Sequence, residues 1–175
     1  MVKACIVGSK VVVSGTTGYT FFWATKSCFS NWHPVSYDCG DQTFNCSEQG
    51  MMWEKAMLFN DLKIAREIMN RPVNDQKGIK NLGRRVHEFD ENVWEKNRIE
   101  IVHRHLRAKF SQNRHLYAEL MGTRDTLLVE ASPYDRIWGI GMNENEAKVT
   151  PESQWKGLNL LGKLLTLVRE ELRQK

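Results

Sequence analysis

Short runs of β-branched and aromatic residues occupy the first 23 positions of the chain. Ile6-Val7 and the run at 10–13 flank Gly8-Ser9, which predicts two strands joined by a turn. The run at 19–23 is β-prone and predicts another strand. From 26 to 46 the chain is rich in turn formers, and an irregular segment of this length is often functional.

The hydrophobic pattern changes to helical spacing after this segment. Apolar residues recur every three or four positions, as in amphipathic helices. The predicted helices span 48–59, 61–69, 74–83 (a short helix or turn), 92–110, 113–121 and 158–172, with a buried strand at 126–130. Asn45 or Ser47 is expected to cap the first helix, in a capping-box arrangement with Glu48. The pattern predicts an α+β fold, a single mostly helical domain (1–175) with a small sheet.

One helix stripe carries two charges among apolar neighbours. Glu48 and Lys55 are seven residues apart, which brings them to within roughly 20° on a helix, about 10 Å apart along its axis. Met51, Met52 and Phe59 lie on or beside the same stripe. Charges normally lie on the opposite face, which makes this stripe a candidate site. The structural alternative is a first-turn acid favoured by the helix dipole and a lysine that reaches to solvent.

Two further groups are candidates for ligand binding. Glu130 ends the predicted strand, and Asp135, Trp138 and Gly139 follow in a loop. Strand ends hold residues rigidly, glycine allows close backbone approach, and tryptophan can stack on a base or sugar. The alternative is a structured loop with an Asp-capped turn and a core tryptophan. Arg84 follows a glycine and is a plausible phosphate contact, although a solvated basic turn is the interpretation that the residues alone favour.

Charge and composition limit the function classes. The net charge of +4 suits an anionic ligand, but the basic residues are dispersed and do not favour a large nucleic-acid surface. No apolar run approaches the roughly 20 residues of a membrane span, and the N-terminus does not resemble a secretory signal, so we expect a cytoplasmic protein without membrane association. Free thiols are expected for the four cysteines. A zinc site is the alternative, and its ligands would be Cys28, His33, Cys39 and Cys46 at irregular spacings.

Six sequence motifs occur in order along the chain. The motifs are Phe29-Ser30-Asn31-Trp32, Ser47-Glu48-Gln49 with Met52, Lys55 and Ala56, Leu82-Gly83-Arg84 with Phe89 and Trp94, the segment 108–113, the segment 128–141, and Gly157 to Gly162 with Leu165 and Arg169. Together they resemble the motifs of the NADAR superfamily, in its branch of YbiA-like N-glycosidases. They occur in the family's order over a NADAR-like core of about 21–172. Gly50 departs from the family, where many members carry an aromatic residue. Residues 1–20 and 142–154 have no recognised counterpart.

The resemblance implies hydrolysis of a ribose C1–N bond. Family substrates are phosphoribosylated aminopyrimidine intermediates of riboflavin synthesis, or ADP-ribose attached to guanine in nucleic acid. The resemblance places the catalytic residues at Glu48, Lys55 and Asp135, and the substrate-binding residues at Asn31, Arg84, Trp94, Glu130, Trp138, Gly139 and Asn159. No cofactor and no metal is expected. The alternative function is a module that binds ADP-ribose or a nucleotide without cleaving it.

These residues have expected roles in such a reaction. Bond cleavage builds positive charge on C1 and the ring oxygen, and Glu48 is expected to stabilise it or to activate water. Asp135 is the second acid/base candidate. Lys55 either acts as an ammonium that binds phosphate or keeps Glu48 ionised, or attacks C1 as an amine and forms a Schiff base. Arg84 is expected to bind phosphate, and Trp94 and Trp138 to contact the base or sugar.

Overall fold

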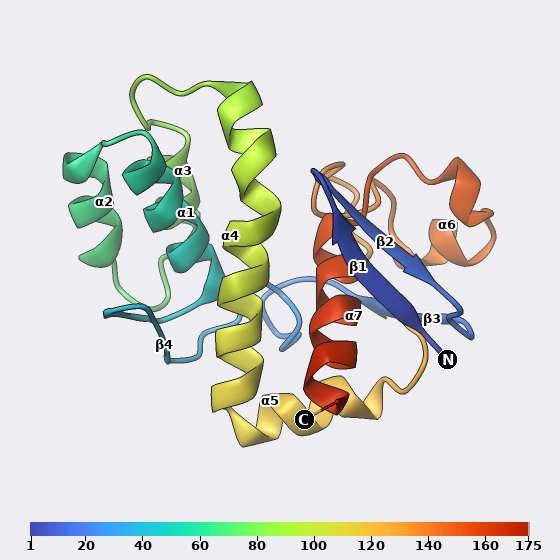
Figure 1. Cartoon of the computed structure of the whole chain (residues 1–175). Coiled ribbons are helices and arrows are strands. Elements are labelled where there is room, and N and C mark those ends of the chain that lie inside the picture. The colour runs from blue at the N-terminus through green and yellow to red at the C-terminus, as the bar shows by residue number, and fades with distance from the viewer. Residues whose placement is uncertain (175) are drawn as a thin grey trace.

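The computed structural model describes residues 1–174 and shows the predicted α+β architecture (Figure 1). Its strands are β1 (Lys3–Val7), β2 (Lys10–Ser14), β3 (Tyr19–Phe22), β4 (Tyr37–Cys39), β5 (Gln42–Phe44) and β6 (Leu127–Glu130). Its α-helices are α1 (Ser47–Leu58), α2 (Leu62–Met69), α3 (Gln76–Gly83), α4 (Glu91–Gln112), α5 (Arg114–Gly122), α6 (Glu144–Lys148) and α7 (Leu160–Arg173). The fold class and the larger predicted elements are confirmed. The predicted domain range of 1–175 ends one residue beyond the described part of the chain.

The strands form three two-stranded sheets. β1 and β2 make an antiparallel hairpin that packs on α7. β3 pairs in parallel with β6, in a register that sets Phe22 opposite Glu130. This pairing joins segments more than 100 residues apart and fixes the end of β6, from which a loop of the site departs. The third pair, β4 and β5, lies in the segment that the sequence predicted as irregular.

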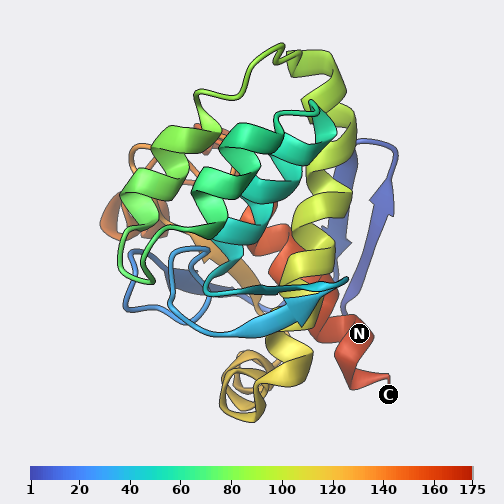
Figure 2. The same ribbon diagram turned by 90° about the vertical axis from the view of Figure 1, so that its left-hand side faces the viewer.

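Two long helices form the centre of the molecule, and α4 packs on both α7 and α1 (Figure 1). Helices α1, α2 and α3 form a layer on one side of α4, as Figure 2 shows. Their apolar faces join one core with fully buried leucines and isoleucines from α2, α3, α4 and α7. Asp61, Asp75 and Asp90 cap helices α2, α3 and α4 through their side chains, which explains where these helices begin.

The predicted cap of α1 is wrong. Cys46 precedes the helix and makes no side-chain cap. Instead, the Glu48 amide donates to the Asn31 carbonyl at 2.8 Å, so a loop distant in sequence satisfies the first turn. A capping box does occur, but at α6, where Asn143 and Glu146 bond reciprocally. Among residues 1–174, no helix is long and apolar enough to cross a membrane.

Candidate functional site

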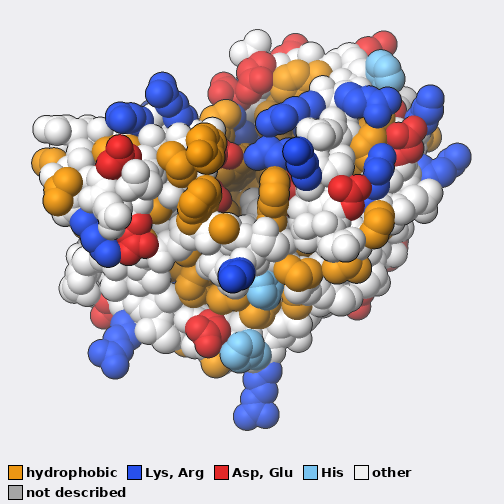
Figure 3. All heavy atoms as spheres, turned by 180° about the vertical axis from the view of Figure 1, so that it is seen from behind, with side chains coloured by type: hydrophobic (Ala, Val, Ile, Leu, Met, Phe, Trp, Pro, Cys, Tyr) orange, Lys and Arg blue, Asp and Glu red, His pale blue; other side chains and the backbone are white. Residues whose placement is uncertain are grey.

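A cleft lies where the first turn of α1, the end of α3 and the loop after β6 meet. Its first lobe has a volume of about 470 Å³. The residues around this lobe are Glu48, Met51, Met52, Lys55, Lys80, Gly83, Arg84, Trp94, Tyr134, Asp135, Arg136, Ile137 and Trp138. Figure 3, which views the molecule from the side opposite to Figure 1, shows a hollow bordered by hydrophobic and by Lys and Arg side chains, with acidic side chains inside it.

A second lobe of about 320 Å³ adjoins the first. Lys80, Arg84, Tyr134 and Asp135 line both lobes, so the two form one continuous cleft. The other residues of the second lobe are Trp23, Ala24, Thr25, Ser30, Trp32, Glu130 and Ser132. Of the ten predicted site residues, the cleft brings together Glu48, Lys55, Arg84, Trp94, Glu130, Asp135 and Trp138.

Glu48 is a buried carboxyl in the first turn of α1, with a side chain only 3% exposed. Its Oε1 atom has no hydrogen-bond partner among the described residues. Burial raises its pKa from 4.5 to about 7, and Asp135 adds to the rise, whereas Lys80, the Trp32 indole and Arg84 oppose it. At neutral pH, Glu48 therefore exchanges readily between its acid and its carboxylate.

Lys80 is a site residue that the sequence reasoning missed. It lies one helical turn before Arg84, so both side chains leave the same face of α3 and reach the cleft. Its Nζ is 3.9 Å from Asp135 Oδ2, and it is the cation with the largest effect on the pKa of Glu48. The spacing of four between Lys80 and Arg84 was the signal that could have revealed it.

Lys55 extends from α1 into a partly aromatic environment. Its Nζ lies 4.0 Å from the centre of the Phe89 ring and 5.5 Å from that of Trp94. Burial lowers the pKa of Lys55, and Arg84 lowers it further, while Glu91 and Glu48 act in the opposite direction. Lys55 is thus half-buried, with an amine that loses its proton more easily than an ordinary lysine.

Glu130 occupies the last position of β6 and faces the second lobe. Its Oε2 atom is buried and has no partner within residues 1–174. Burial raises the pKa of Glu130 to about 8, and the negative charges of Asp135 and Glu48 contribute, against a smaller effect of Lys80. The cleft therefore holds two desolvated carboxyls, one in each lobe.

Asp135 has both a structural and a cleft-facing oxygen. Its Oδ1 accepts hydrogen bonds from the Ile137 and Trp138 amides at 2.9 and 2.8 Å, which is the Asp-capped turn considered above. Its Oδ2 faces Lys80. The turn sets Trp138 on the wall of the first lobe. Only one of the two oxygens of Asp135 is therefore available to a ligand.

Three predicted binding residues do not line the cleft. The Asn159 side chain accepts a hydrogen bond from the Glu130 backbone N–H through Oδ1 and donates one from Nδ2 to the Leu128 carbonyl, both at 3.0 Å, and so fixes β6 against α7. Gly139 packs where a Cβ would lie 2.9 Å from the Glu130 carbonyl oxygen. Asn31 is buried and supports Glu48 through its backbone carbonyl. In this structure these three residues lie outside the cleft and support the segments that line it.

Lys109 supports the loop at 29–32 from the core. It is fully buried, and its Nζ donates to the Ser30 carbonyl at 2.9 Å. Burial lowers its pKa to about 7, against opposing effects of Cys28 and Cys46. Lys109 thereby ties α4 to the loop at 29–32, which carries Trp32 and contacts the start of α1.

Gly50, the departure from the family pattern, is explained by its neighbours. A Cβ at Gly50 would lie 2.4 Å from the His105 ring and 2.8 Å from the Tyr37 hydroxyl. His105 is fully buried, and its Nδ1 lies 3.0 Å from that hydroxyl. The imidazole therefore occupies the space that a larger side chain would take, and Gly50 does not open the cleft.

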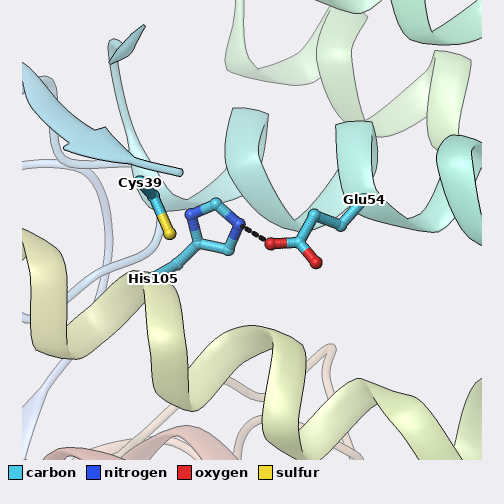
Figure 4. A group of neighbouring side chains, drawn as sticks. All are labelled: Cys39, Glu54 and His105. Atoms are coloured by element: carbon cyan, nitrogen blue, oxygen red, sulfur yellow. Dashed lines mark ion pairs between the residues drawn. The ribbon is translucent and has the colours of Figure 1, made fainter. Parts of the chain in front are cut away.

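One group of described residues has the composition of a metal site. The ligand atoms of Cys39, Glu54 and His105 lie within 4.8 Å of one another. In Figure 4, however, Cys39 and Glu54 lie on opposite sides of the imidazole. Glu54 already pairs with His105 Nε2 at 2.7 Å and with the Arg104 guanidinium, so a cation there would meet a positive neighbour. The alternative set of Cys28, His33, Cys39 and Cys46 does not form a group among residues 1–174.

Comparisons with known proteins support the resemblance. A family model described as the NADAR domain matches residues 21–173. N-glycosidase R617 of Acanthamoeba polyphaga mimivirus is 41% identical over 170 residues, which are 91% of this chain and 99% of that protein. A riboflavin biosynthesis protein of Vibrio vulnificus is 28% identical over 145 residues, covering 83% of this chain and 35% of that protein. The NMR structure of the E. coli protein YbiA superposes with a TM-score of 0.72 at 28% identity, covering 92% of this chain and 88% of that one.

Proposed function

This chain belongs to the NADAR family and is an N-glycosidase, a hydrolase of N-glycosyl bonds, and we propose that it hydrolyses the C1–N bond of a phosphorylated ribose. The ribose carries a phosphate or an ADP group, and the leaving group is a nitrogen heterocycle. The observation that carries this proposal is the placement of the desolvated carboxyls of Glu48 and Glu130 in one cleft, beside a cluster of cations.

We assign to Glu48 the stabilisation of the positive charge that develops on the sugar. The transition state of N-glycoside cleavage carries positive charge on C1 and the ring oxygen, which a nearby carboxylate stabilises. Glu48 is also suited to accept a proton from the attacking water, since its pKa of about 7 matches neutral conditions. Asp135 stays the second candidate for acid/base work, and its Oδ2 adds negative charge to the cleft beside Lys80.

The cations of the first lobe are suited to phosphate oxygens. Lys80, Arg84 and Arg136 line this lobe, and a guanidinium binds phosphate through two parallel donors. Trp94 and Trp138 supply flat apolar surfaces in the same lobe. This combination favours a sugar phosphate over a neutral nucleoside, because only the phosphorylated ligand neutralises the cations.

Lys55 has two roles that fit its position. As an ammonium it binds phosphate, and as a free amine it attacks C1 and forms a Schiff base with the opened ribose. An ion pair of Lys55 with Glu48 is not favoured, because Lys55 Nζ lies over the Phe89 ring and forms no ion pair with Glu48 within residues 1–174, and because Lys80 is the cation with the largest effect on the pKa of Glu48. Sodium borohydride added during turnover separates the two roles. A reduced sugar adduct on Lys55 indicates covalent catalysis, and its absence in an active sample indicates the electrostatic role.

Two sources of substrate share this chemistry, and one paired assay distinguishes them. The purified protein is incubated with the phosphoribosylated aminopyrimidine and, separately, with DNA that carries ADP-ribosylated guanine. Free base and free sugar phosphate are measured, with Glu48→Gln as the control for contaminating activity. Cleavage of one substrate assigns the source. Binding of both without any cleavage would support a non-catalytic module and refute the proposal.

A further inference from the structure

The second lobe has the surfaces that a planar heterocycle needs. Trp23, Trp32 and Tyr134 contribute aromatic rings to it, and Ser30 and Ser132 contribute polar atoms. Trp23 is 50% exposed and Tyr134 is 88% exposed, with their ring centres 6.3 Å apart at the mouth of the lobe. Exposed aromatic side chains at the mouth of such a pocket are suited to stacking on a base.

Two hydrogen bonds and the strand pairing hold the backbone of Glu130 at the edge of this lobe. Its amide donates to Asn159 Oδ1 at 3.0 Å, its carbonyl accepts from the Ile140 amide at 3.0 Å, and its register position in the sheet lies opposite Phe22. These contacts hold the backbone of Glu130 in place, while its Oε2 is buried and has no partner among the described residues. A buried oxygen of this kind is costly unless a ligand completes its hydrogen bonding.

From this geometry we propose that the second lobe is the pocket for the leaving base, and that Glu130 is the general acid that protonates the departing nitrogen. The inference rests on the proposed N-glycosidase function and adds a binding site and a catalytic role to it. Asp135 is less suited to this role, because its Oδ1 is engaged by the Ile137 and Trp138 amides.

The proton and electron balance is that of a simple hydrolysis. As the C1–N bond breaks, its electron pair passes to the nitrogen, which takes the proton from the Glu130 carboxyl. A water oxygen bonds to C1, and Glu48 accepts the proton that this water loses. Exchange with solvent then returns Glu130 to its acid and Glu48 to its carboxylate. Burial raises the pKa of both carboxyls well above 4.5, so each of them can hold a proton near neutral pH.

A change of leaving group tests the acid role. The departing nitrogen of an aminopyrimidine or a guanine needs a proton, whereas nicotinamide mononucleotide releases neutral nicotinamide without one. We expect Glu130→Gln to lower kcat on the first class by roughly 100- to 10,000-fold and to leave kcat on the pyridinium substrate within about threefold. Glu48→Gln, as the matched control, is expected to slow both classes.

The outcomes separate the inference from the function on which it rests. Equal loss on both classes in Glu130→Gln overturns the acid role, while a wild-type protein that cleaves neither class overturns the proposed function. If only the first class is turned over, the pH profile of kcat decides. The wild-type rate is then expected to decline above about pH 8, and the residual rate of Glu130→Gln to lack this decline. An unchanged decline overturns the inference.

Product inhibition tests the pocket itself. The free base is expected to inhibit the wild-type enzyme from the second lobe, and Trp23→Ala to raise its inhibition constant roughly fivefold or more, since a lost stacking contact weakens base binding. Tyr117→Ala removes a comparably exposed aromatic residue from α5, outside the cleft, and serves as the control. An unchanged inhibition constant in Trp23→Ala would place the base elsewhere.

Discussion

Glu48 is expected to reduce the stability of the fold at the pH at which it is catalytically useful. The pKa of the buried carboxyl rises from 4.5 to about 7, so the folded state holds this proton more tightly than the unfolded state. Below pH 4.5 both states are protonated, and the group has no effect. Between pH 4.5 and 7 the unfolded state has lost the proton and the folded state retains it, so stability falls as the pH rises. Above pH 7 the penalty is constant.

The size of the penalty follows from the same two values. Because one pH unit corresponds to about 1.4 kcal/mol, a pKa rise from 4.5 to about 7 gives a penalty of about 3 kcal/mol. Glu48→Gln removes the ionisation and nearly preserves the shape of the side chain. We therefore expect this variant to be more stable than the wild type by about 3 kcal/mol at pH 8.5, and by much less at pH 4.5.

Urea denaturation at these two pH values measures the effect. The comparison is the difference in free energy of unfolding between variant and wild type, with Glu100→Gln at an exposed position of α4 as the control. The negative charge of Glu48 also raises the pKa of Glu130, so the substitution lowers the cost of ionising Glu130 as well. This increases the stability difference between variant and wild type at high pH. A glutamine variant that is less stable than the wild type at pH 8.5, or a stability difference independent of pH, would show that the ionised Glu48 carboxylate does not destabilise the fold.

Three other substitutions test the packing around Gly50, the buried charge of Lys109 and the phosphate contact of Arg84. Gly50→Ala is expected to destabilise the fold by about 1–3 kcal/mol, because its Cβ would lie 2.4 Å from the His105 ring; an unchanged melting temperature would contradict this. Lys109→Met is expected to gain stability relative to the wild type as the pH falls from 10.5 to 7, by at most about 5 kcal/mol, because burial lowers the pKa of Lys109 to about 7. A difference that does not change over that range in urea titrations would disprove it. Arg84→Ala is expected to raise KM tenfold or more with a smaller change in kcat, since one phosphate contact is lost, and steady-state kinetics with an unchanged KM would exclude that contact.

The sequence predicted the stripe of α1 because helical periodicity alone places Glu48 and Lys55 on one face. It missed Lys80. The spacing of four places this side chain on the same face of α3 as Arg84, but whether that face meets the cleft depends on how α3 packs against α1. It also missed the second lobe, whose aromatic walls come from the segment after β3 and the loop after β6, joined by a parallel pairing of distant strands.

The motifs themselves combine two kinds of residue. Glu130 faces the cleft, while the side-chain oxygen and nitrogen of Asn159, in the neighbouring motif, both hydrogen-bond to the backbone of β6. Lys109 likewise resembles a site residue in type, yet it supports a loop from the core. A family motif therefore identifies the region of the site, but only the contacts separate the groups that meet a ligand from those that hold them in place.

A single-turnover measurement with a phosphorylated ribose N-glycoside tests directly whether Glu48 takes part in cleavage of the C1–N bond. Enzyme in excess is mixed with substrate, and the release of free base is followed for the wild type and for Glu48→Gln, with binding measured in parallel. We expect release of base by the wild type, a rate at least 100-fold lower in the variant, and similar dissociation constants for both. Tight binding by the wild type with no release of base, or equal rates in the two proteins, would contradict this expectation.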